Sequence, residues 1–162
     1  MKRPFPDGYL LTYSEEHIFY EFEMFLWLAT VCAGGKNLTA PTEADFKFLN
    51  NVLVEAFVLH LRNVVDFLYL DNHQATDIVA ADFIEEDWKA VRPVMTATLQ
   101  TAKTRANKEI AHLTTSRIAG TPPEKGWDFK GLASELIPIM TTMVKKADSA
   151  RLSPKVKGIL VT

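Results

Sequence analysis

Apolar residues recur at intervals of three and four in four stretches of the sequence, and no stretch shows the strict alternation of a half-buried β-strand. This spacing is typical of amphipathic helices. We expect four long helices, over about 13–34, 42–69, 93–115 and 128–147. Helices of this length with short or moderate connections predict an all-α fold, an up-and-down bundle of four to five helices in a single domain over 1–162.

Capping residues set the predicted helix ends. Thr12 and Glu15 have the spacing of a capping box, and Gly34-Gly35 would end the first helix. Thr42 and Asp128 are suitable N-caps for the second and fourth helices, and a proline is tolerated in a first turn. The third helix is therefore expected to begin near Pro93. Pro138 should kink the fourth helix.

The segments between and beyond these helices carry weaker signals. The acidic connector 71–87 contains one stretch, 78–83, that could form a short helix. Residues 1–11 and about 152–162 are expected to be mobile or irregular termini, since each is short and the second is basic.

The first two helices carry apolar residues outside their main stripes. They are Phe19, Trp27 and Val31 in the first helix and Phe48, Phe57 and Val65 in the second. A helix that is apolar around most of its circumference is either central to the fold or part of an oligomer interface. We therefore expect a homodimer.

Composition favours a soluble protein in a reducing compartment. Hydrophobic residues make up 48% and charged residues 23% of the chain, which is typical of a globular domain. The single cysteine, Cys32, cannot form an internal disulfide, and we expect a cytoplasmic protein. The apolar run 24–33 is too short to span a membrane, so no membrane association is expected.

Charge is unevenly distributed along the chain. The net charge is −2, but residues 1–88 hold five basic and fifteen acidic side chains, whereas residues 89–117 hold six basic and one acidic. A local basic field can recruit a phosphodiester even on an acidic protein. The same segment could equally dock on the acidic first half of the chain, and both interpretations stay open at this point.

The centre of the basic segment pairs an arginine with a histidine. Arg105 and His112 are seven positions apart, which in an α-helix places both on one stripe about 10 Å apart. A guanidinium can hold a phosphate through two hydrogen bonds, and an imidazole moves protons near neutral pH. Asn107 and Lys108 could support them, and Glu109 could orient His112 or neutralise Arg105. The inward seam of this helix is expected to be Leu99, Ala102, Ala106, Ile110 and Leu113.

An Arg-x6-His motif in an all-helical chain, with the pairs Asn107-Lys108 and Ala111-His112 inside it, resembles the HEPN superfamily. Ala106 stands where many members carry a polar residue. The resemblance implies a metal-independent endoribonuclease without a cofactor, acting in a toxin, defence or RNA-processing context. It also implies a homodimer with its motifs at the interface, and a cognate antitoxin or another regulatory protein as a partner.

In such an enzyme His112 would shuttle protons between the ribose 2′-hydroxyl and the leaving oxygen, and Arg105 would stabilise the charge that develops on the phosphorus. Crossing two copies of this helix about a two-fold axis would bring Arg105 of each close to His112 of the other. The alternative is a non-catalytic nucleotide-binding or protein-interaction module with the same fold.

A second polar cluster lies on the predicted second helix and comprises His60, Arg62, Asn63 and Asp66. His60 and Asn63 share an apolar stripe, which favours a buried hydrogen-bonded pair over a functional site. Arg62 and Asp66 have the spacing of a helix-face salt bridge. Glu109-x-x-His112 occurs only once, so no di-metal site is expected, and a metal held by His60 and His112 would require the two rings to converge.

Overall fold

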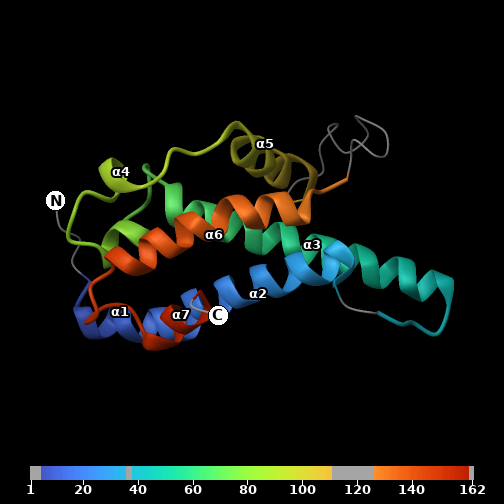
Figure 1. The fold of residues 1–162 in the computed structure, drawn as a ribbon, viewed down its shortest axis with the longest axis horizontal. Helices are drawn as coiled ribbons and strands as arrows, with labels where there is room; N and C mark the ends of the chain where they lie inside the picture. Colours follow the sequence, from blue (N-terminus) through green and yellow to red (C-terminus); the bar gives the residue numbers. More distant parts are fainter. Residues whose placement is uncertain (1–4, 36–37, 111–125, 161–162) are drawn as a thin grey trace.

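The computed structural model describes residues 5–35, 38–110 and 126–160. These residues form helices packed against one another, as Figure 1 shows, which confirms the predicted all-α bundle. The described chain has no β-sheet, and its one extended pairing is a single antiparallel bridge between Ile84 and Ala147.

The first helix is longer than its sequence pattern predicts. It runs through α1 (Asp7–Tyr13), a π-helical turn η1 (Ser14–Ile18) and α2 (Phe19–Thr30), and it begins after Pro6 rather than near Tyr13. Thr12 does not cap it: the hydroxyl of Thr12 donates instead to the carbonyl of Gly8, inside the helix. The extra turns form because Leu10 is buried in the core. The first helix ends in η2 (Val31–Gly35), where Gly34 has φ of +79°, a conformation that favours glycine.

The two ends of the chain pack together, contrary to the expectation of irregular termini. A short helix, α7 (Pro154–Ile159), lies beside the first helix in Figure 1, and Val156 within it is fully buried. The buried hydroxyl of Ser14 donates to the carbonyl of Leu11 and accepts a hydrogen bond from the backbone N–H of Ser153 at 2.9 Å. At the two ends of the chain, residues 1–4 and 161–162 lie outside the described ranges.

The second long helix, α3 (Glu43–Tyr69), has the predicted bounds. Thr42 caps it by accepting from the backbone N–H of Asp45 at 3.1 Å. With 27 residues α3 is about 40 Å long, and in Figure 1 its first half extends past the other helices.

The connector after α3 contains the expected short helical piece, the 3-10 helix η3 (Ala80–Phe83), and a further short helix, α4 (Trp88–Val91). The third long helix, α5 (Ala97–Arg105), does not begin near Pro93, because Thr96 caps it by accepting from the N–H of Leu99. The carbonyl of Pro93 instead accepts from the hydroxyl of Tyr69. From Arg105 the chain continues as a π-helix, η4 (Ala106–Ile110).

The last long helix, α6 (Phe129–Lys146), is capped by Asp128 as predicted, through the N–H of Gly131. It runs through Pro138 as one element, and the carbonyl of Pro138 accepts from the hydroxyl of Thr142. A proline has no backbone N–H to donate, so this position contributes one hydrogen bond fewer to the helix.

The core lies between α2, α3 and α6. Its largest fully buried side chains include Phe22, Phe25, Phe57, Leu61, Leu136 and Met140. The rings of Phe25 and Phe57 stack with centroids 5.6 Å apart, and Phe129 packs edge-on against Phe57.

This core absorbs several residues that the sequence had assigned to a possible dimer interface. Val31, Phe57 and Val65 are buried within their own chain, and Phe19 is partly buried. Only Trp27 and Phe48 of that set are exposed. No helix in the described part of the chain is long and apolar enough to cross a membrane.

Candidate functional site

Arg105 lies at the end of α5 and joins it to the start of α6. Its Nη1 donates to the carbonyl of Gly126 at 3.1 Å, and its guanidinium carbon lies 4.2 Å from the centre of the Trp127 ring. Asp128 begins α6 directly after Trp127, so the helix cap fixes where the aromatic ring can lie. A guanidinium over an indole at this distance is a cation–π contact, which orients both side chains.

A pocket of about 420 Å³ opens beside this contact. Its lining includes Thr98, Thr101, Arg105, Trp127, Asp128 and Leu132. Arg105 and Trp127 are both half-buried, so part of each is accessible from solvent. The lining thus combines a cation, an aromatic face, hydroxyl groups and an apolar floor with one carboxylate, Asp128, whose Oδ1 accepts the N–H of Gly131. Such a combination suits a nucleotide better than a wholly apolar ligand.

The predicted inward seam of this helix is confirmed where it can be seen. Leu99, Ala102 and Ala106 are buried. The side chain of Ile110 and the whole of Leu113 lie outside the described residues.

The supporting residues of the Arg105 motif are only partly visible. Asn107 is half-buried and Lys108 is exposed on η4. The side chain of Glu109 and the whole of His112 lie outside the described residues, so the pairing of Arg105 with His112 stays a prediction.

The π-helical geometry of η4 alters the spacing that was expected between Arg105 and the residues after it. The expected separation of two turns assumed a regular α-helix, but η4 begins directly after Arg105 and holds more residues per turn. Residues 107–110 are therefore rotated around the axis relative to their positions in a regular α-helix. Single π-helical turns inside α-helices are frequent at functional sites.

His60 and Asn63 of the second polar cluster are connected by hydrogen bonds to Glu21, a residue that the sequence analysis did not assign to the cluster. Glu21, on α2, receives His60 and Asn63 on its two oxygens: His60 Nδ1 lies 2.8 Å from Oε2, and Asn63 Nδ2 donates to Oε1 at 3.2 Å. The expected direct pair between His60 and Asn63 is therefore wrong, because a carboxylate 39 positions before His60 bridges them. The edge of the Tyr20 ring packs against His60.

The remaining members of this cluster also join helices. Arg62 and Asp66 form the predicted i,i+4 pair, with Nε 3.7 Å from Oδ2. Asp66 also receives Lys103 Nζ of α5 at 2.6 Å. Glu21 thus binds an imidazole and an amide of α3, and Asp66 binds Lys103 of α5, so these contacts join α3 to α2 and to α5.

A pocket of about 390 Å³ lies next to Glu21 and Asp66, with Tyr13 on its wall. Burial raises the pKa of the Tyr13 hydroxyl, and the nearby charges of Tyr9 and Glu21 raise it further. A neutral phenol beside bound carboxylates is not equipped to hold a phosphate, since it adds no positive charge.

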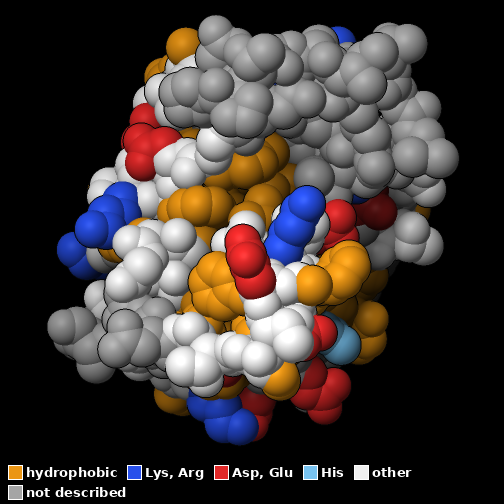
Figure 2. All heavy atoms as spheres, turned by 90° about the vertical axis from the view of Figure 1, so that its right-hand side faces the viewer, with side chains coloured by type: hydrophobic (Ala, Val, Ile, Leu, Met, Phe, Trp, Pro, Cys, Tyr) orange, Lys and Arg blue, Asp and Glu red, His pale blue; other side chains and the backbone are white. Residues whose placement is uncertain are grey.

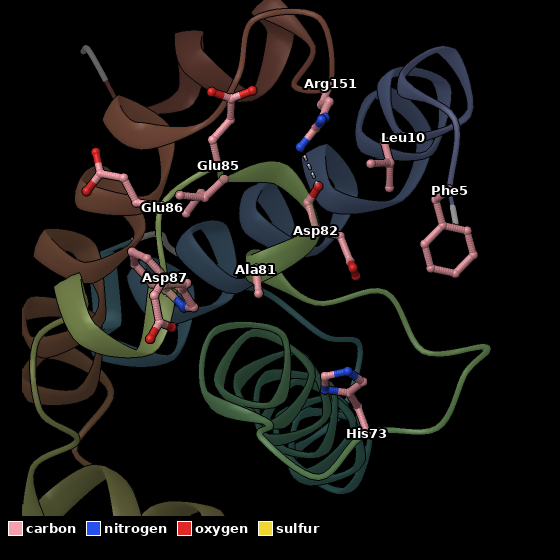
Figure 3. Close-up of a pocket in the computed structure, with 11 residues that line it drawn as sticks. Phe5, Leu10, His73, Ala81, Asp82, Glu85, Glu86, Asp87 and Arg151 are labelled. Atoms are coloured by element: carbon pink, nitrogen blue, oxygen red, sulfur yellow. Dashed lines mark hydrogen bonds between the residues drawn. The ribbon is translucent and has the colours of Figure 1, made fainter. Parts of the chain in front are cut away.

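A third pocket, of about 400 Å³, lies between α1 and the segment 81–88 and is drawn in Figure 3. Its charged lining is mostly acidic: Asp82, Glu85, Glu86 and Asp87. The one arginine there, Arg151, is bound to Asp7 at 2.7 Å and donates to the carbonyl of Asp82, shown as a dashed line in Figure 3. Carboxylates in excess repel phosphates, so this pocket does not compete with the Arg105 pocket for a nucleotide.

The described residues contain no group of three or more His, Cys, Asp or Glu side chains arranged to hold a metal ion. A scan against protein-family models and searches of curated proteins and of solved structures found nothing that matches this chain.

Proposed function

We propose that the protein binds RNA or a nucleotide in the pocket beside Arg105. The observation that carries this proposal is the half-buried contact between the Arg105 guanidinium and the Trp127 ring at the edge of that pocket. Arginine binds phosphate oxygens through its planar fork of N–H donors, and tryptophan offers a surface on which a base can stack. One N–H of Arg105 already holds the carbonyl of Gly126, which fixes the guanidinium at the pocket.

Two neighbouring features support a polyanionic ligand. The basic segment of the sequence contains Arg105, and exposed Lys108 follows it by less than one turn. The acidic residues of the chain are concentrated before residue 89, and those that line the pocket of Figure 3 do not line the Arg105 pocket. A single-stranded RNA is therefore our preferred ligand, because several phosphates can use this field at once.

Metal-independent cleavage is the second part of the proposal, and it rests on the resemblance to the HEPN superfamily. His112 would take the proton of the ribose 2′-hydroxyl as the oxygen attacks phosphorus, and a protonated imidazole would return a proton to the leaving 5′-oxygen. Arg105 would stabilise the negative charge on the phosphoryl oxygens. The products would carry a 2′,3′-cyclic phosphate and a 5′-hydroxyl. A homodimer and a regulatory partner such as a cognate antitoxin belong to the same proposal.

Binding is tested first, with a fluorescently labelled single-stranded RNA of mixed sequence and purified protein in EDTA. We expect Arg105→Ala to weaken binding at least about tenfold, which corresponds to about 1.4 kcal/mol. Arg105→Lys should recover only part of the affinity, because an ammonium lacks the planar fork. Lys47→Ala is the matched control, since Lys47 is an exposed basic residue on α3, outside the basic segment. Wild-type protein that does not bind, or equal affinities for wild type and Arg105→Ala, would refute the site.

Cleavage is tested with the same RNA and the same buffer. If His112 is the proton carrier, His112→Ala keeps the binding affinity and loses cleavage, while Arg105→Ala loses both. Cleavage by all three proteins would indicate contamination or another site. Binding without cleavage by the wild type would leave a non-catalytic nucleotide-binding module.

A further inference from the structure

The two halves of α3 differ in burial. Every residue that α3 buries lies between Phe57 and Tyr69, and none lies between Glu43 and Ala56. We call residues 43–56 the arm. In Figure 1 the arm extends past α2 and α6 at one end of the molecule. Figure 2 faces that end and shows hydrophobic side chains at the surface beside charged ones.

Three exposed apolar side chains of α3 lie along one face, while a fourth, Phe46, is 46% exposed and lies on the other side of the helix. Phe48 is 68% exposed, Val52 is 61% exposed and Leu59, just past the arm, is 51% exposed. Steps of four and seven residues place all three on one stripe of an α-helix. We call Phe48, Val52 and Leu59 the outer stripe.

The outer stripe points away from its own core. Phe57, Leu61 and Val64, which are fully buried, lie on roughly the opposite side of the helix. The described part of the chain therefore leaves the stripe uncovered. Large apolar side chains in a row on a soluble helix commonly mark an interface.

We propose that the outer stripe binds the outer stripe of a second copy of this chain, with the two α3 helices antiparallel about a two-fold axis. The register that sets Phe48 of one copy opposite Leu59 of the other has a further consequence. Asp45 is three residues before Phe48, and Arg62 is three residues after Leu59, so the same register sets Asp45 opposite Arg62. By symmetry the Phe48–Leu59 contact and the Asp45–Arg62 ion pair each form twice.

The charges select this arrangement over its parallel alternative. In a parallel pair Asp45 would face Asp45 and Glu55 would face Glu55, and both contacts are repulsive. In the antiparallel pair Val52 packs against the methylene groups of Glu55, whose carboxylate reaches solvent at the edge. Arg62 is half-exposed and its Nε lies 3.7 Å from Asp66, so its guanidinium is placed at the face where Asp45 of the second copy would lie.

This dimer differs from a crossing of the motif helices and does not rest on RNA binding. The arm of each copy covers Leu59 and Arg62 of the other, which extends the contact over most of α3.

The oligomeric state of the full chain tests the proposal. Sedimentation equilibrium of the wild type over a range of concentrations should show a monomer–dimer equilibrium. Val52→Glu should raise the dimer Kd at least about tenfold, because it places a second carboxylate beside Glu55 of the other copy. Val94→Glu is the matched control: Val94 is 89% exposed and lies outside α3, so its substitution should leave the Kd unchanged.

Exchange of the two charges gives a sharper test of the register. Asp45→Arg and Arg62→Asp should each weaken the dimer, and the double variant should restore it, because the ion pair returns with its signs reversed. Circular dichroism checks that each variant is folded. A wild type that stays monomeric, a dimer that Val52→Glu does not weaken, or a double variant as weak as the single ones would each overturn this interface. RNA binding by a monomeric wild type would overturn the dimer and leave the Arg105 site standing.

Discussion

The two halves of α3 belong to one continuous helix, yet they differ in how much of their surface the rest of the chain buries. The half from Phe57 onward holds the core together, whereas no residue of the arm is fully buried and only Leu53, Val54 and Ala56, near its end, pack partly against the core. Most residues of the arm are exposed, and helix propensity alone contributes little there, since most helical stability in proteins comes from packing. The comparison separates residues that fold this protein from residues that are available to a partner.

The largest effect on stability is expected when two phenylalanines on the same helix are compared. We expect Phe57→Ala to lower the free energy of unfolding by about 3–5 kcal/mol, because it leaves a cavity between Phe25 and Phe129. Phe48→Ala should change it by less than about 0.5 kcal/mol at concentrations where the protein is monomeric. Urea unfolding followed by circular dichroism measures both. Similar losses for the two variants would mean that the arm is packed against its own chain.

A smaller effect is expected from the buried polar contact of the packed half. Glu21→Ala removes the partner of His60 and Asn63 at once and should cost about 1–3 kcal/mol, because a buried polar group loses its hydrogen bonds. Glu23→Ala, at an exposed position on the same helix, is the control. If the two substitutions have equal effects in urea unfolding, Glu21 does not join α2 to α3.

The smallest effect should come from the cap of the arm. Thr42→Ala removes the acceptor of the Asp45 N–H and should destabilise the first turns by about 1 kcal/mol. We expect this loss as faster hydrogen exchange of the arm amides, with the urea midpoint nearly unchanged, because the arm opens without the core. Thr39→Ala, at an exposed position before the helix, should change neither quantity. An equal shift of the urea midpoint and the arm amides would contradict the independence of the two halves.

Local signals in the sequence were sufficient for much of the fold. Thr42, Asp128 and Gly34 set helix ends through their own side chain or backbone conformation, so no distant contact is needed to interpret them. The start at Asp7 could not be predicted in this way, since it depends on burial of Leu10 against the rest of the molecule. Pro93 was misassigned because Thr96, three residues later, supplies a better cap.

The candidate site shows the same division. The sequence singled out Arg105 because of its residue type and spacing, but Trp127 is 22 positions away and was not predicted to contact it. Glu21 was likewise not predicted as part of the polar cluster, because it contacts His60 only when α2 packs against α3. A sequence pattern can nominate a side chain, whereas its partners depend on tertiary packing.

The hydrogen bond between Ser14 and Ser153 forms late in synthesis of the chain. The N–H that binds the Ser14 hydroxyl is synthesised 139 residues after Ser14 itself. Until then Leu10 and Ser14 lack the segment that finally covers them. The first helix is therefore synthesised well before it reaches its native surroundings, and until residue 153 is made the nascent chain exposes the apolar surface around Leu10.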